Sequence, residues 1–317
     1  MSLHPESLAY VEAVDAWLAE RSLPPLHRLG PARAREIAHE MILEDRPPLE
    51  PVDWVEDHMV PARSGPRRVR IIRPSTARQG PLPVALYFHG GGYVIGGIDE
   101  SEHEARRLAQ RLPALVVSAS YRLAPEHPFP AAVEDGYDAL MWIAHHAHAY
   151  GGDHRRIMVG GNSAGAGLAA AVTRLSVTEN GPPVTLNYLF CPWLDLTLDE
   201  PSVDEHAEGT NLTREELDWF ARCYLGTTGQ AADPLISPSL HAVPRGMPPT
   251  VILTAECDPL RDEAARYAEA LRDAGTEVVH HVAPGMIHGF NVLLHAIPEG
   301  DRHVKQAEAA IRRLVRA

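Results

Sequence analysis

A serine in a tight glycine-rich turn is the strongest chemical signal in this sequence. Ser163 is the middle residue of Gly-Asn-Ser-Ala-Gly at 161–165, between a strand-like run at 156–160 and an alanine-rich segment. A serine between a strand and a helix has its hydroxyl exposed beside the helix N-terminus, and small flanking residues permit the tight turn. The pattern predicts a nucleophile; the alternative is an incidental serine in a glycine-rich turn.

Three consecutive glycines follow His89, where a second strand-like run at 84–88 ends. Their backbone N–H groups can face a ligand, and such donors stabilise the oxyanion of a tetrahedral intermediate. The alternative is a phosphate-binding loop, but this stretch lacks the Lys-Ser/Thr of a P-loop and the spacing of a dinucleotide fingerprint. Acyl-transfer chemistry explains both glycine-rich loops together.

A serine hydroxyl needs a neighbouring base, which a third group must orient. Asp258 follows the strand-like run 251–255, and His288 follows the run 277–282. Both are therefore expected just beyond the carboxyl ends of strands, where open parallel sheets bind their ligands. The carboxylates that compete with Asp258 are Glu256, Asp262 and Glu263. We prefer Asp258 because it lies in the loop after the strand and outside the next helix.

No cofactor and no metal are expected. The histidines clustered at 145, 146, 148 and 154 show neither the HExxH pattern nor a carboxylate at ligand spacing, and they indicate a solvated helix end. The three cysteines, Cys191, Cys223 and Cys257, cannot all pair within one chain, and none forms a CxxC motif. This cysteine usage favours a reducing, cytoplasmic location.

The charge balance restricts the partners. A formal net charge of -13 and a pI near 5.7 disfavour nucleic acid and anionic membrane surfaces, because no basic stripe can neutralise phosphates. The first residues show no signal-peptide pattern, and no apolar run approaches the roughly 18 residues of a membrane span. We expect a small-molecule substrate and no integral membrane association.

Strand-like and helical segments alternate along most of the chain. After an antiparallel strand pair expected within 53–73, strand-like runs occur at 84–88, 115–120, 157–160, 186–190, 251–255 and 277–282. The helical segments between and after them are 102–112, 131–148, 164–177, 262–274 and 302–315. This alternation predicts an α/β fold with a mainly parallel central sheet flanked by helices.

Four motifs together resemble those of the hormone-sensitive lipase family of esterases, in its bacterial branch. They are the His-Gly-Gly-Gly sequence at 89–92, the stretch 121–135, the turn at 161–165, and Asp-Pro-Leu-Arg-Asp-Glu at 258–263 with His-Gly-Phe at 288–290. The resemblance covers almost the whole chain and implies an α/β-hydrolase fold with a helical cap. It implies Ser163, Asp258 and His288 as the catalytic triad, and the amides of Gly91, Gly92 and Ala164 as oxyanion-hole donors.

The resemblance also assigns supporting parts. His89 and the segment 121–135 would brace the oxyanion loop, and the cap would consist of N-terminal helices within residues 1–50 and an insertion at about 196–238. Residues 51–317 would then form the catalytic domain. The candidates for lining an acyl pocket, or else for filling the core of the cap, are Trp219, Phe220, Tyr224 and Leu225. The sequence departs from the family pattern at Asn162 and Ser120, which would alter local hydrogen bonding only.

The expected function is that of a serine carboxylesterase, which hydrolyses short- to medium-chain carboxylic esters through an acyl-enzyme intermediate. One alternative is a non-catalytic small-molecule receptor on the same fold; receptors that resemble this family have lost the catalytic histidine, whereas His288 is retained here. A second alternative is an amidase or lactonase with the same triad, because pocket shape sets selectivity. The resemblance also allows a homodimer through a sheet-edge strand.

Overall fold

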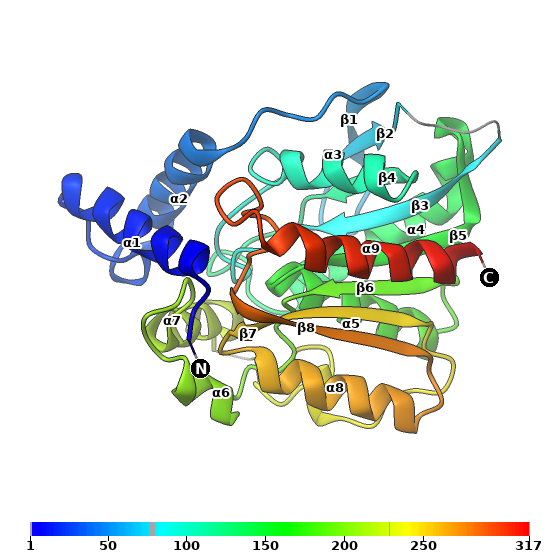
Figure 1. The fold of residues 1–317 in the computed structure, drawn as a ribbon. Helices are drawn as coiled ribbons and strands as arrows, with labels where there is room; N and C mark the ends of the chain where they lie inside the picture. Colours follow the sequence, from blue (N-terminus) through cyan, green and yellow to red (C-terminus); the bar gives the residue numbers. More distant parts are fainter. Residues whose placement is uncertain (1, 76–79, 228, 317) are drawn as a thin grey trace.

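An eight-stranded, mainly parallel sheet organises the computed structural model, which describes residues 2–75, 80–227 and 229–316 (Figure 1). The strand order is β1-β2-β4-β3-β5-β6-β7-β8, and only the β1–β2 and β2–β4 pairs are antiparallel. The strands are β1 (Trp54–Val60), β2 (Arg67–Arg73), β3 (Leu82–Phe88), β4 (Leu115–Ala119), β5 (Gly152–Asn162), β6 (Leu186–Phe190), β7 (Thr250–Cys257) and β8 (Val278–Ile287). The predicted α/β fold is confirmed.

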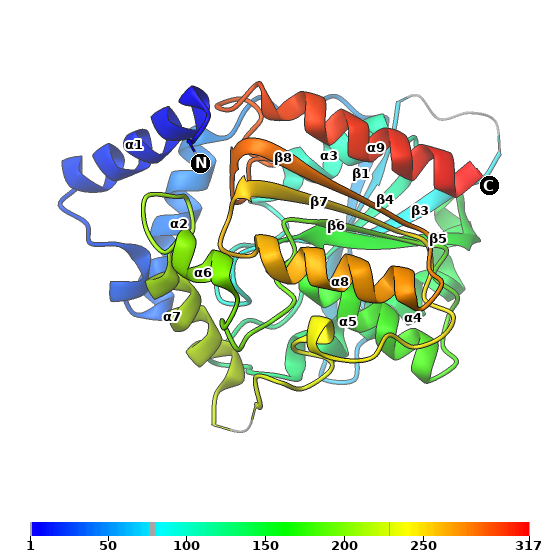
Figure 2. The same cartoon turned by 60° about the horizontal axis from the view of Figure 1, so that its bottom comes forward.

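Helices cover both faces of this sheet (Figures 1 and 2). One face carries α3 (Glu102–Arg111) and α9 (Gly300–Arg316), and the other carries α4 (Ala131–His146), α5 (Ala164–Thr178) and α8 (Arg261–Asp273). Side chains alternate along each strand, so Leu86 and Phe88 of β3 enter the core beneath α4 and α5, while Tyr87 enters the core beneath α3 and α9. Double coverage explains why β4 and β6 are buried along their whole length.

Four further helices gather at the carboxyl ends of the parallel strands (Figures 1 and 2). They are α1 (Pro5–Glu20), α2 (Pro31–Asp45), α6 (Pro201–Glu205) and α7 (Arg214–Leu225). Pro24 and Pro25 lie between α1 and the 3-10 turn η1 (Leu26–Arg28). A capping box between Thr213 and Glu216 starts α7. Within the described ranges, no helix combines the length and the apolar character that crossing a membrane requires.

The last strand is longer than the sequence predicts. The predicted strand ends at residue 282, but β8 continues through Pro284 and Gly285 to Ile287, with a register shift against β7. A side chain of β7 and a residue before α1 satisfy the backbone of Gly285: its N–H donates to the Glu256 carboxylate at 2.8 Å, and its carbonyl accepts from the amide of His4 at 2.9 Å. His288 is therefore the first residue after a strand.

Candidate active site

The turn between β5 and α5 holds Ser163 in a strained backbone conformation. Its φ of 55° lies in the left-handed region, which non-glycine residues rarely adopt, and its amide donates to the carbonyl of Phe190 at 2.9 Å. Ser163 is thus the single residue between the end of β5 and the start of α5. Its Oγ lies 2.9 Å from Nε2 of His288.

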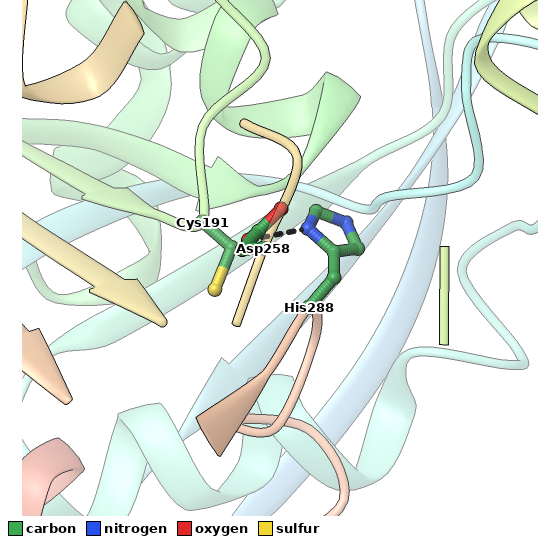
Figure 3. A group of neighbouring side chains, drawn as sticks. All are labelled: Cys191, Asp258 and His288. Carbon is green, nitrogen blue, oxygen red and sulfur yellow. Dashed lines mark hydrogen bonds and ion pairs between the residues drawn. The ribbon is translucent and has the colours of Figure 1, made fainter. Parts of the chain in front are cut away.

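The histidine is bonded in turn to a carboxylate. Nδ1 of His288 lies 2.8 Å from Oδ2 of Asp258, which follows β7, and Oδ1 of Asp258 accepts from the amide of Leu260 (Figure 3). The exposed fractions of Ser163, His288 and Asp258 are 8%, 7% and 0%. Because these side chains are screened from water, their mutual electrostatic interactions are stronger than on the surface. The structure thus brings the three predicted side chains into one hydrogen-bonded line.

The competing carboxylates have other partners. Glu256 accepts from the amide of Gly285, and Asp262 forms an ion pair with Arg261. Glu263 is fully buried and accepts from the amide of Leu194. Burial raises the pKa of Glu263 well above its usual value. In the described part of the chain, Asp258 is the carboxylate bonded to His288.

The glycine-rich loop after β3 packs against this turn. Gly165 lies so close to the backbone of Phe88 and His89 that a β-carbon at residue 165 would overlap their carbonyl oxygens. The amides of Gly91, Gly92 and Ala164 donate to no backbone acceptor within the described ranges. These three predicted donors therefore remain available to a ligand beside Ser163, and the N-terminus of α5 adds a favourable field for negative charge.

His89 and Tyr121 support the glycine loop. The phenolic oxygen of Tyr121 donates to the carbonyl of His89 at 2.8 Å, and the two rings stack with centroids 4.4 Å apart. Nδ1 of His89 lies 2.7 Å from the carbonyl oxygen of Gly90, and burial lowers the pKa of this imidazole. Asp135, at the end of the same segment, is buried and accepts from the amide and Nε of Arg122. These contacts suit a bracing role.

A thiol that the sequence analysis did not place here lies beside the carboxylate. The ligand atoms of Cys191, Asp258 and His288 lie within 4.8 Å of one another, a grouping that could hold a metal ion (Figure 3). However, burial and the nearby Asp258 raise the pKa of the Cys191 thiol well above its usual value. A metal ion held here would have to displace the proton of this thiol and break the 2.8 Å bond between His288 and Asp258, so the donor set does not favour a metal. An unpaired cysteine was the only sequence signal.

Aromatic side chains of α7 meet the glycine loop. The ring of Phe220 covers Gly92 so closely that a β-carbon at residue 92 would overlap it. Tyr224 instead stacks on Tyr93 with ring centroids 3.8 Å apart and is 1% exposed. Among the four candidates for the acyl pocket, Phe220 therefore faces the proposed oxyanion donors, whereas Tyr224 fills a core.

The segment around α6 and α7 also contacts the loops of both the histidine and the aspartate. Nδ2 of Asn211 donates to the carbonyl of His288 at 3.2 Å, and Oγ of Ser202 donates to the carbonyl of Pro259 at 2.7 Å. The sequence analysis missed both residues, because a single polar side chain in an insertion has no spacing that distinguishes it.

A model of the α/β-hydrolase fold family matches residues 85–292, from β3 to the turn after His288. This chain belongs to the α/β-hydrolase family. The matched range includes all six residues predicted to form the triad and the oxyanion hole.

Curated relatives of this α/β hydrolase are named as esterases. Carboxylesterase NlhH of Mycobacterium tuberculosis is 38% identical over 252 residues, which cover 78% of this chain and 79% of the relative. Ethyl acetate hydrolase of Pseudomonas putida is 34% identical over 304 residues, which cover 95% and 96%. The predicted membership of the esterases similar to hormone-sensitive lipase is confirmed.

Solved structures of α/β hydrolases agree over nearly the whole chain. An ester hydrolase from the metagenome of Lake Arreo is 34% identical, with a TM-score of 0.93 and 98% of each chain covered. The hyperthermophilic esterase of the archaeon Pyrobaculum calidifontis is 36% identical, with a TM-score of 0.89 and 100% of each chain covered. The α/β-hydrolase fold predicted from the four motifs is therefore confirmed.

Proposed function

We propose that this protein is a serine carboxylesterase that hydrolyses short- to medium-chain carboxylic esters through an acyl-enzyme intermediate. The observation that carries the proposal is the continuous line from Ser163 Oγ to His288 Nε2, at 2.9 Å, and from His288 Nδ1 to Asp258 Oδ2, at 2.8 Å. An imidazole that bonds a serine hydroxyl on one side and a carboxylate on the other can accept the serine proton.

The proposed reaction has two halves. His288 takes the proton of Ser163 as the hydroxyl oxygen attacks the ester carbonyl carbon, and Asp258 holds the imidazole in the tautomer that can accept this proton. The amides of Gly91, Gly92 and Ala164 would stabilise the oxyanion as it forms. The imidazolium then protonates the leaving alcohol. Water, activated by the same imidazole, cleaves the acyl-enzyme and releases the carboxylic acid.

The proposed substrate size follows from the covering helices. We assign residues 1–50 and about 196–238 to a cap over a catalytic domain at 51–317. Phe220 of this cap lies against Gly92, so an acyl or alcohol group bound beside the oxyanion donors meets an aromatic wall. Such a wall favours small groups. The name of the ethyl acetate hydrolase relative is in keeping with a small ester.

A burst experiment tests the proposal. Mixing excess p-nitrophenyl acetate with the protein should release one equivalent of p-nitrophenol rapidly, followed by a slower steady state, and Ser163→Ala should abolish both phases. Ser118→Ala is the matched control, since Ser118 is buried in β4 away from the turn and should keep the burst. Absence of a burst in the wild type, together with tight binding of an unreacted ligand, would favour the receptor.

An amidase or lactonase remains a variant of the same chemistry. Rates on an acetate ester, the matching acetanilide and a simple lactone, measured on one preparation, decide between them. We expect the ester to be the fastest substrate; it should exceed the anilide because amide resonance makes the carbonyl carbon less electrophilic and an amide anion is a poorer leaving group than an alkoxide. A higher kcat/KM on the anilide or the lactone would replace the esterase assignment.

The proposal extends to location and assembly. Cys191 and Cys257 are buried and all three cysteines are free in the described structure, as suits a reducing cytoplasm. A homodimer through an edge strand of the sheet is proposed for the assembly. Fractionation of cells that produce the native chain and light scattering of the purified protein test these two points.

A further inference from the structure

The helix α3 presents three polar side chains to the turn that follows His288. Nε2 of His103 lies 3.1 Å from the carbonyl oxygen of Val292. Arg107 donates to the carbonyl of Asn291 at 2.6 Å, and Nδ2 of Asn291 donates to a carboxylate oxygen of Glu104 at 3.4 Å. A single face of one helix therefore bonds both the backbone and a side chain of this turn.

These groups are buried at a considerable energetic cost. Asn291 is 0% exposed, Glu104 is 2% exposed and Arg107 is 5% exposed. The second carboxylate oxygen of Glu104 accepts from the hydroxyl of Tyr87. Burial raises the pKa of Glu104 to about 6, and the nearby Arg107 opposes this shift. Apolar side chains would stabilise such a position equally well or better, so its polar groups call for an explanation other than stability.

Asn291 links this helix to the residues around Asp258. On its other side, Oδ1 of Asn291 accepts from the Cys191 thiol, with the sulfur 3.6 Å away. The sulfur belongs to the group that lies within 4.8 Å of the reactive atoms of Asp258 and His288 (Figure 3). Asn291 is thus in contact with α3 and with the neighbour of the carboxylate at the same time.

The backbone between His288 and Asn291 is short and fixed. The amide of Phe290 donates to the carbonyl of Ile287 at 3.1 Å, and the amide of Val292 donates to the carbonyl of Gly289 at 3.0 Å. A displacement of Asn291 would therefore be passed to His288 over only three residues. A shift of about 1 Å in a reacting group can cost about 100-fold in rate.

We propose that Asn291, held by Glu104 and Arg107 of α3, is a positioning residue that fixes the imidazole of His288 at hydrogen-bonding distance from Ser163. The inference rests on the proposed function, since it assigns a role in the same reaction. Glu104 and Cys191 occupy the two polar atoms of the Asn291 side chain, and the residue is 0% exposed, so we expect it not to contact the substrate. Its loss should lower kcat and leave KM nearly unchanged.

A matched pair of asparagine variants tests the proposal. Asn187 is also 0% exposed and accepts a hydrogen bond from Thr173, but it lies within β6 and away from the histidine turn. We expect Asn291→Ala to lower kcat about 10- to 100-fold with KM within threefold. Asn187→Ala should lower the melting temperature and keep the wild-type kcat. A kcat within twofold of wild type in Asn291→Ala, or an equal loss in both variants, would overturn the proposal.

A substitution in α3 covers the case in which Asn291→Ala does not fold. Glu104→Leu keeps the approximate size of the side chain but removes both carboxylate oxygens, so Asn291 loses its bond to this residue. We expect kcat to fall about 3- to 30-fold at constant KM. An unchanged kcat in Glu104→Leu would contradict the role of α3.

A spectroscopic measurement separates this inference from the proposed function. The Nδ1 proton of His288, bonded to Asp258, should give a low-field NMR signal that His288→Gln removes. We expect Asn291→Ala to broaden or shift this signal and Asn187→Ala to preserve it. If the wild type and these variants give the expected signals but the wild type hydrolyses no ester, the proposed function fails and the positioning role stands. If the signal is unaltered in Asn291→Ala, the positioning role is disproved, even if the protein is an active esterase.

Discussion

The ring of Phe220 packs against Gly92, although the two residues are 128 positions apart in the sequence. The ring belongs to α7, outside the sheet, and the glycine belongs to the loop that follows β3. This contact joins the helix to the proposed oxyanion donors without a hydrogen bond. Two predictions follow directly from it.

A methyl group at residue 92 should disable the site. Gly92→Ala places a β-carbon inside the ring of Phe220 and imposes a φ of +59° on an L residue. The loop must therefore move, and its amides no longer point toward the oxyanion. We expect kcat to fall at least about 100-fold, the usual consequence of losing one oxyanion donor. Steady-state kinetics on p-nitrophenyl butyrate give the value. Gly275→Ala is the control, because Gly275 has a φ of +84° with open space around it.

Removal of the ring at position 220 should enlarge the accepted acyl group. Phe220→Ala opens space above Gly92, so the maximum of kcat/KM along a series of p-nitrophenyl esters should move to longer chains. Phe129→Ala removes a ring that packs against Tyr224 instead, and it should keep the wild-type order. The same order of preference in Phe220→Ala and in the wild type would show that this wall does not limit acyl length.

The carboxylate at position 258 should be indispensable for turnover. Asp258→Asn keeps the shape of the side chain, but it can favour the tautomer of His288 that donates to Ser163 and cannot accept the serine proton. We expect kcat to fall about 10⁴-fold with little change in KM. Asp262→Asn is the control among the competing carboxylates and should retain most of the activity. Comparable losses in both variants would leave the assignment of Asp258 without support.

Acid should weaken the fold through the buried His303, which contacts the half-buried His281. Nε2 of His281 lies 2.7 Å from Nδ1 of His303, and burial lowers the pKa of His303 to about 4. The unfolded chain binds this proton near pH 6.5 and the native state only near pH 4, so stability is full above pH 6.5 and falls below it. For His303 alone the loss between pH 7.5 and pH 5 is about 2 kcal/mol.

Urea unfolding at these two pH values measures the loss. His303→Gln should lower the pH dependence of the unfolding free energy by this amount, because the variant carries no titrating group at the buried position. His154→Gln, at an exposed position, should leave the dependence as it is in the wild type. An unchanged slope in His303→Gln would show that other groups cause the acid sensitivity.

Local sequence was sufficient to predict the parts of the site that depend on the backbone. Ser163 and the glycines after His89 stand out because a tight turn and exposed amides require small residues in consecutive positions. Asp258 and His288 could be placed because parallel strands end at one edge of the sheet. In each case the constraint acts within a few residues.

Parts of the site that depend on distant residues could not be predicted in this way. The sequence predicted the end of β8 at residue 282, because a Pro-Gly pair usually stops a strand; Glu256 and His4 supply the missing partners from far away. Glu104 and Arg107 were not singled out from the sequence, because charged residues on a helix usually face solvent. Their position beside the apolar residues of α3 was the only signal that they face the core.

The contact between His4 and Gly285 affects how the chain is made. Glu6 bonds the amide of Glu299 in the same region, so α1 docks on residues that the ribosome adds almost 300 positions later. Trp17 and Arg21 at the other end of α1 bond Glu44 of α2, but during synthesis the N-terminal end of α1 has no partner until residues 285 and 299 emerge. A nascent chain that stops before β8 therefore lacks both His288, the proposed general base, and residues on which the start of α1 docks.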